Sequence, residues 1–114
     1  MAGARQNLTT GLSVILGATG SGQVALGPDI GPPNWHVTSI ITQTNRPGLT
    51  PIPKVSLYLD GVAPENALCV SYDGSFGQAN GDQDLTRGQR LIAVWTGGQA
   101  GDRATLTVNG ERWA

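Results

Sequence analysis

The side chains that could do chemistry are few and scattered. The 114-residue chain contains one histidine, His36, and one cysteine, Cys69. A catalytic histidine needs a nucleophile and an orienting acid beside it, and no nucleophile signature such as G-x-S-x-G occurs. One cysteine excludes an intramolecular disulfide and a cysteine-based zinc site, and one histidine excludes sites that need several imidazoles. We therefore expect a non-enzyme in which His36 is a polar surface or interface residue and Cys69 is a small buried hydrophobe.

Three aspartates, Asp73, Asp82 and Asp84, lie in a glycine-rich polar segment that could supply oxygen ligands to calcium. The spacing does not match the EF-hand loop, and aspartate is much more common in turns than in calcium sites. Turn formation is the favoured interpretation, so we predict no metal site and keep calcium as the alternative.

A second segment, residues 17–24, is close to the phosphate-loop pattern G-x-x-x-x-G-K-[ST]. Gln23 stands where the lysine would contact phosphate, and Val24 stands where a hydroxyl would bind magnesium. The next residues include Gly27-Pro28 and cannot begin the helix whose N-terminus would hold a phosphate. We interpret the segment as a hairpin turn and predict no nucleotide or other cofactor.

The charge content argues against two classes of partner. Seven Lys and Arg oppose eight Asp and Glu, for a formal net charge of −1, and only 13% of residues are charged. Such a chain has no basic patch for nucleic acid or for an anionic membrane surface. No 18-residue apolar segment is long enough for a membrane helix, and no leader typical of secretion is expected at the start.

The elements that must position these residues are strands. Helical periodicity is nearly absent, whereas short runs rich in Val, Ile, Thr, Tyr and Trp alternate with turn residues, including 17 Gly and 7 Pro. The predicted strands cover residues 11–18, 22–26, 34–44, 53–60, 67–72, 89–96 and 102–109, with a polar loop over 73–84. Because a single sheet would leave an apolar face uncovered, seven to eight strands indicate one antiparallel β-sandwich, jelly-roll or Ig-like, over residues 11–114. Residues 1–10 are expected to form a flexible N-terminal arm.

Alternation within the strands predicts which side chains face inward. Val55, Leu57 and Leu59 should lie in the core, and the segment 89–96, apolar on both faces, should be central in its sheet. Strict alternation over 34–44 assigns one face to Trp35, Val37, Ser39 and Ile41.

The aromatic residues supply the remaining candidate sites. Trp35 and Trp95 are predicted to pack in the core. Trp113 follows Arg112 beyond the last predicted strand, and both residue types are frequent in interface hot spots, so Arg112 and Trp113 form a candidate partner interface. Tyr58 and Tyr72 are candidate glycan contacts.

The C-terminal half contains a string of turn and strand residues with a recognisable order. It comprises Leu85, Gly88, Leu91, the run Val94-Trp95-Thr96-Gly97-Gly98, the run Gly101-Asp102, the run Ala104-Thr105-Leu106, Val108 and Gly110-Glu111. In this string Gly88 would turn the chain into the central strand, and Gly110 would permit a left-handed turn after the last strand.

This string, with Asn34-Trp35 and Val37 after Gly31-Pro32-Pro33, resembles small β-sandwich structural proteins of tailed phages infecting actinobacteria. The resemblance implies a non-enzymatic virion protein of the minor tail or tail-tip type. Such a protein assembles through contacts with copies of itself and with other virion proteins. A capsid decoration or head-fibre protein is the first alternative. A carbohydrate-binding module that contacts a host surface glycan is the second.

Overall fold

The structure is a computed structural model that describes residues 5–29 and 31–114, without the side chains of residues 70, 71 and 79–81. The described chain contains eight strands, one short 3-10 helix and no α-helix, which confirms the all-β prediction. The elements are β1 (Gln6–Ile15), β2 (Gly22–Leu26), β3 (Asn34–Thr44), β4 (Lys54–Leu59), η1 (Pro64–Asn66), β5 (Ala67–Asp73), β6 (Phe76–Thr86), β7 (Leu91–Thr96) and β8 (Arg103–Trp113).

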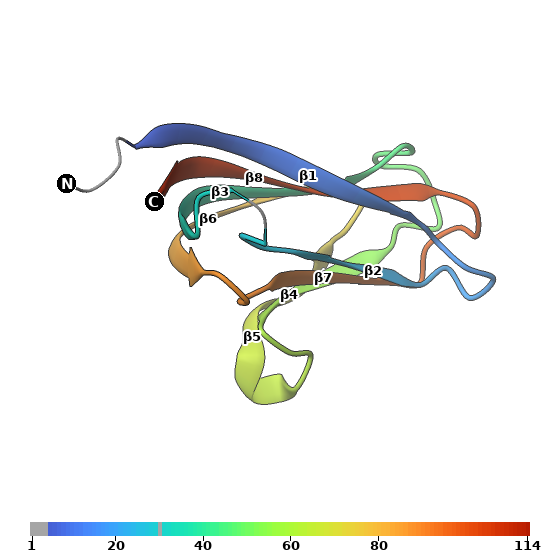
Figure 1. Cartoon of the computed structure of the whole chain (residues 1–114). Helices are drawn as coiled ribbons and strands as arrows, with labels where there is room; N and C mark the ends of the chain where they lie inside the picture. Colours follow the sequence, from blue (N-terminus) through green and yellow to red (C-terminus); the bar gives the residue numbers. More distant parts are fainter. Residues whose placement is uncertain (1–4, 30) are drawn as a thin grey trace.

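The strands form two four-stranded sheets that pack face to face (Figure 1). The first sheet has the order β1-β8-β3-β6, and the second sheet has the order β2-β7-β4-β5. All the pairings are antiparallel. An Ig-like sandwich would place its first two strands in one sheet, whereas β1 and β2 lie in different sheets here. Of the two topologies that the sequence left open, the strand order is therefore that of an eight-stranded jelly roll.

The first and last strands are longer than the sequence patterns predict. Residues 6–10, expected to belong to a flexible arm, form the first half of β1 and pair with the end of β8. Leu8, the Cα partner of Gly110, is buried in the core. Its burial holds this half of β1 in register, because a shift by one residue would turn Leu8 to the outer face. β8 continues to Trp113, four residues past the predicted end. Residues 1–4 of the expected arm lie outside the described residues.

The polar loop predicted over residues 73–84 is wrong, because most of it is strand β6. Its Gly, Asn, Asp and Gln residues have low strand propensity. They form a strand nevertheless because the side of β3 that faces away from β8 offers a ladder of backbone partners. The ladder extends from Gln43 opposite Phe76 to Asn34 opposite Thr86. Leu85 adds one fully buried side chain near the end of β6.

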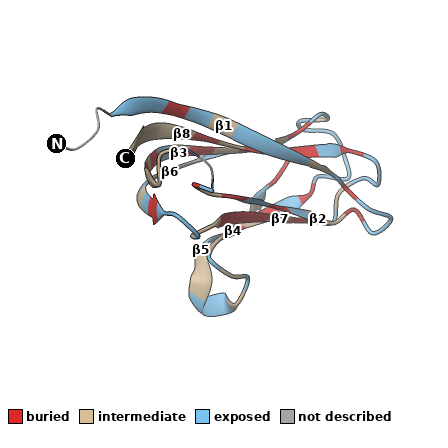
Figure 2. Ribbon diagram, viewed as in Figure 1, coloured by how far each residue is buried: buried red, intermediate tan, exposed pale blue. Residues whose placement is uncertain are grey.

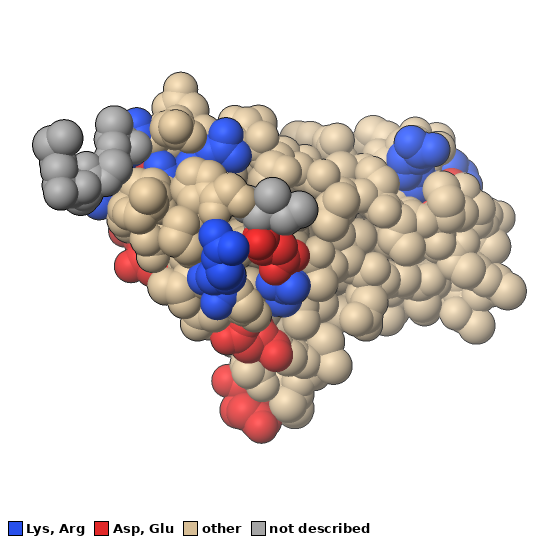
Figure 3. Space-filling view, viewed as in Figure 1, with Lys and Arg blue, Asp and Glu red and all other residues tan. Residues whose placement is uncertain are grey.

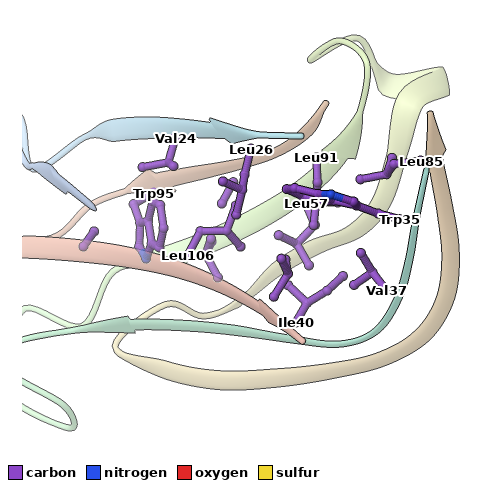
Figure 4. Packing of buried hydrophobic residues seen from close by; sticks show 14 of the residues in the cluster. Val24, Leu26, Trp35, Val37, Ile40, Leu57, Leu85, Leu91, Trp95 and Leu106 are labelled. Carbon is purple, nitrogen blue, oxygen red and sulfur yellow. The ribbon is translucent and has the colours of Figure 1, made fainter. Parts of the chain in front are cut away.

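The core lies between the two sheets, where the buried residues of both inner faces meet (Figure 2). Figure 4 shows side chains from the two sheets pointing toward one another, with Trp35 and Trp95 apart along the core. Both tryptophans are buried, as predicted, and Trp95 Nε1 donates to the carbonyl of Gly74 at 2.9 Å. The inward positions of Val55 and Leu57 are also confirmed.

Strict alternation fails in the middle of β3. The pairing of β3 with both neighbours shifts between Val37 and Ser39, so Thr38 is an extra residue in a β-bulge. Buried positions therefore change from odd to even numbers after the bulge, and Ile40 and Thr42 face the core in place of Ser39 and Ile41.

Gly110 marks the same bulge on β8, which corrects its predicted place in a turn after the last strand. It lies inside β8, where a Cβ atom would be only 1.9 Å from the carbonyl oxygen of His36. Glycine is required here by the close approach of two backbones rather than by a left-handed conformation. Gly88 and Gly97 do have positive φ values, 96° and 73°, and turn the chain on either side of β7. The predicted central place of β7, between β2 and β4, is confirmed.

Candidate functional site on the outer face and edge of the first sheet

His36 lies between two carboxylates on the outer face of the first sheet. Its Nδ1 donates to Asp84 Oδ1 at 2.5 Å, and its Nε2 is 3.3 Å from Asp82 Oδ1. The β-ladder explains the contact, because His36 on β3 is the Cα partner of Asp84 on β6 and of Glu111 on β8. Both ring nitrogens therefore face acceptors, which is the arrangement of an imidazolium held by carboxylates rather than of a catalytic base.

The same carboxylates raise the pKa of His36 above its ordinary value of 6.5. The hydrogen bond that His36 donates to Asp84 is the largest cause, and the charges of Asp84 and Asp82 act in the same direction. Asp82 and Asp84 contact His36, whereas Asp73 Oδ1 accepts hydrogen bonds from the backbone N–H and the hydroxyl of Ser75. The three aspartates of the calcium alternative are thus not brought together, and the described residues contain no cluster suited to a metal.

Arg5 and Trp113, near the two ends of the chain, form a second cluster of side chains with Glu111. The Arg5 guanidinium lies 4.0 Å from the centre of the Trp113 ring, and Arg5 Nη1 is 3.7 Å from Glu111 Oε2. The Asn34 side-chain amide also donates to the Trp113 carbonyl at 3.4 Å. Trp113 is therefore the end of a paired strand whose ring is covered by a cation, and it is neither loose nor fully exposed.

Arg112 and Trp113, predicted to form one interface, are neighbours in a strand and so point to opposite faces of the first sheet. Arg112 is the Cα partner of Trp35, which is buried in the core. Its side chain therefore lies at the end of the core. Its Nε atom is buried and makes no hydrogen bond with the described residues. Only Trp113 remains on the outer face, so the two residues do not form a single contact surface.

The candidate glycan contacts are also separated. Tyr72 packs against the core, and its hydroxyl is 2.9 Å from Thr42 Oγ1 on the opposite sheet. Burial raises the pKa of Tyr72, as expected for a phenol directed inward. Tyr58 is half-buried and points outward from β4, since the flanking Leu57 is in the core. The two rings lie on opposite faces of the second sheet and cannot stack on one sugar chain.

Cys69 is exposed, so the prediction of a buried cysteine is wrong. It lies on β5, the edge strand of the second sheet, which projects away from the sandwich (Figure 1). The opposite sheet therefore does not cover it. The segment 17–24 contains a turn, in which the Gly20 N–H donates to the Gly17 carbonyl at 2.8 Å. It connects two strands of different sheets, however, and is not a hairpin.

The feature that sequence reasoning missed is the open edge of β1. Among the strands that the structure describes, β1 is the outermost in the first sheet and pairs only with β8. Leu12 is 49% exposed and Ile15 is 54% exposed, although both belong to a regular strand. No charged residue and no proline occurs between Gln6 and Ile15. On the face shown in Figure 3, most charged side chains lie on the half that holds the termini and on the projecting part at the bottom, and the right half has one basic patch in a largely uncharged surface.

A signal for this edge was present in the sequence. Ten consecutive residues without charge or proline are unusual for an edge strand, because charged residues and proline are the common means of preventing edge pairing. The strand order was needed to show that β1 is an edge.

Comparison with known proteins identifies no family. No protein-family model matches the sequence, and no curated protein matches it. The chain is similar in structure to a chain of the solved "Structure of infectious bursal disease virus Gx strain", with 19% identity and a TM-score of 0.36. The match covers 96% of this chain and 31% of that chain, so this chain spans less than a third of its length. This likeness is too distant to support an argument about function.

The part of the chain that the structure describes has no helix with the length and apolarity needed to cross a bilayer. Among the described residues, three arrangements stand out as available for function. They are a carboxylate-held histidine, a tryptophan covered by arginine, and an uncharged strand edge with exposed apolar side chains. The groups of the first two contact each other within the chain, whereas the backbone groups at the third have no partner strand among the residues that the structure describes.

Proposed function

We propose that the protein is a non-enzymatic structural protein of a phage virion, which assembles through contacts with copies of itself and with other virion proteins. The observation that carries this proposal is the uncharged open edge of β1, where Leu12 and Ile15 are exposed beside unpaired backbone groups. Long edges of this kind promote association between chains. The resemblance of the string from Leu85 to Glu111 to phage β-sandwich proteins supports the virion as the location.

Within the virion, we propose the minor tail or tail-tip position first and the capsid decoration or head-fibre position as the alternative. The resemblance supports both. We propose no nucleic-acid partner and no insertion into a membrane, in line with the formal net charge of −1. The glycan-binding alternative is not carried further, because Tyr58 and Tyr72 lie on opposite faces of the second sheet.

The proposal is tested on purified particles. Mass spectrometry should detect the protein as a stoichiometric component, and immunogold labelling should place it on the tail or on the capsid shell. Labelling of the tail supports the tail proposal, whereas labelling of the shell supports the decoration alternative. Absence of the protein from particles that otherwise contain their full set of components would refute the virion proposal.

A further inference from the structure

The four sheet edges of the sandwich differ in how well they are protected from pairing. The β2 edge is only five residues long. The β5 edge has two register irregularities against β4 and projects away from the sandwich. The β6 edge contains Asp82 and Asp84 and an irregularity opposite Thr38. Short length, bulges and charge are the usual protections of edges, and β1 has none of them.

The backbone groups at the β1 edge can be assigned from the hydrogen bonds next to the strand. The Leu16 N–H donates to the Asp102 carbonyl at 2.8 Å, so the backbone groups of Leu16 point toward the segment that leads into β8. The Asn45 N–H donates to the Arg103 carbonyl at 3.1 Å, so the groups of Arg103 point toward β3, and those of its neighbours point toward β1. The β1–β8 register is continuous, so successive residues of β1 direct their backbone groups alternately toward β8 and away from it. Both hydrogen bonds agree on which residues point which way.

Under this alternation, even-numbered residues of β1 bond to β8, and odd-numbered residues present their N–H and C=O groups at the open edge. Within the described strands, the residues whose edge groups have no partner are Asn7, Thr9, Gly11, Ser13 and Ile15. A ladder that alternates in this way is complementary to an antiparallel copy of itself.

We propose that a second copy of this chain pairs with the open edge of β1, antiparallel and two-fold symmetric about Leu12. This inference rests on the proposed function, because it names the surface through which the chain would self-assemble. In this register Thr9 pairs with Ile15 of the second copy and Gly11 pairs with Ser13. The open N–H and C=O groups of each copy therefore face the open C=O and N–H groups of the other. The two first sheets then form one continuous eight-stranded sheet, since each contributes four strands.

Leu12 selects this register over neighbouring ones. Its own backbone groups point to β8, so the two copies of Leu12 face each other as a non-hydrogen-bonded pair, the closer of the two kinds of cross-strand pair. The contact would cover two side chains that are each 49% exposed in the single chain. No charge in β1 opposes the approach of a second β1, which favours a copy of this chain over a charged partner.

The test is the mass of the purified chain in solution, measured by sedimentation over a range of concentrations. The wild-type chain should have twice its 11.8 kDa mass. Leu12→Lys and Leu12→Glu should each be monomeric, because like charges would meet across the two-fold axis. An equimolar mixture of the two variants should recover the dimer, since Lys would then face Glu. Leu49→Lys is the matched control, because Leu49 is 55% exposed in the loop after β3 and should leave the dimer intact.

Disulfide trapping tests the register independently. In a Cys69→Ser background, which removes the exposed native thiol, Leu12→Cys should form a covalent dimer on mild oxidation. The Cα atoms of a non-hydrogen-bonded pair lie within disulfide range. Thr10→Cys should not crosslink, because Thr10 would face Val14 of the second copy. Crosslinking of Thr10→Cys instead would overturn the Leu12-centred register.

Two results would overturn the edge proposal as a whole. One is a wild-type chain that remains monomeric at high concentration, and the other is a multimer that Leu12→Lys does not dissociate. In the second case self-assembly would stand and a different surface would carry it. Neither result bears on the presence of the protein in particles, which is measured separately, so failure of the edge proposal is distinguishable from failure of the proposed function.

Discussion

The hydrogen bond between Thr42 and Tyr72 links the two sheets, and its removal should have an asymmetric cost. Thr42 is fully buried on β3, whereas Tyr72 on β5 is only partly buried, and their hydroxyl oxygens are 2.9 Å apart. Tyr72→Phe leaves the Thr42 hydroxyl in the core without a partner. We expect this to lower the free energy of unfolding by about 1–3 kcal/mol, the usual cost of an unsatisfied buried polar group.

Thr42→Val should cost less, about 1 kcal/mol or below, because the Tyr72 side chain as a whole is only partly buried, so its unpaired hydroxyl is less strongly desolvated than that of Thr42. The double variant removes both polar atoms and should be more stable than the sum of the single losses predicts. The expected coupling free energy is about 1 kcal/mol.

The assay is urea unfolding at neutral pH, followed by tryptophan fluorescence, for the wild type, both single variants and the double variant. A loss of about 1 kcal/mol should also lower the melting temperature by roughly 4 °C in a domain of this size. If the two single losses add to within about 0.3 kcal/mol in the double variant, the hydroxyls do not interact and the reasoning is refuted.

Three further outcomes are expected. Gly110→Ala should destabilise the fold by more than about 2 kcal/mol, seen as a lower urea midpoint, because its Cβ would meet the His36 carbonyl at 1.9 Å. Since the pKa of His36 is raised, its charged form stabilises the fold fully below about pH 6.5 and loses this effect as pH rises through the folded value. Melting temperatures from pH 5 to 9 should show this decline in the wild type, and not in His36→Gln. Arg5→Ala should expose the Trp113 ring, with a red-shifted emission and a loss of about 1 kcal/mol or less.

Replacement of Tyr72 would change the stability of the core as well as any contact with a glycan. Because its hydroxyl ties the two sheets together, Tyr72→Ala would remove a packed ring from the core along with any sugar contact. Loss of binding in that variant would report instability, and Tyr58→Ala would be the cleaner test.

The parts of the fold that the sequence predicts are those set by local alternation. Val55 and Leu57 alternate with polar residues and lie in the core, and β7 is apolar on both faces and lies in the centre of its sheet. The parts that it does not predict depend on distant partners. β6 reads as a loop and becomes a strand because β3 lies beside it, and the bulge at Thr38 appears only when β3 is paired with β6 and β8.

The candidate sites also depend on partners that are distant in the sequence. Sequence spacing gave no indication that His36 would lie between Asp82 and Asp84, because the contact is made by strands 46 or more residues apart in the chain. Arg112 and Trp113 seemed one surface because they are adjacent, but a strand sends neighbours to opposite faces. The β1 edge required the strand order, since an uncharged strand in the centre of a sheet would have no such consequence.

The position of β8 in the middle of the first sheet has a consequence for how the chain folds. β8 separates β1 from β3, and its pairing joins Gln6 to Arg112, positions more than 100 residues apart. The first sheet cannot close until β8 has been synthesised, and folds dominated by such distant pairings form in milliseconds to seconds rather than microseconds. During that interval both edges of β1 are open to any chain nearby. Productive assembly therefore depends on completing each sandwich before neighbouring copies meet, so refolding yield should fall as protein concentration rises.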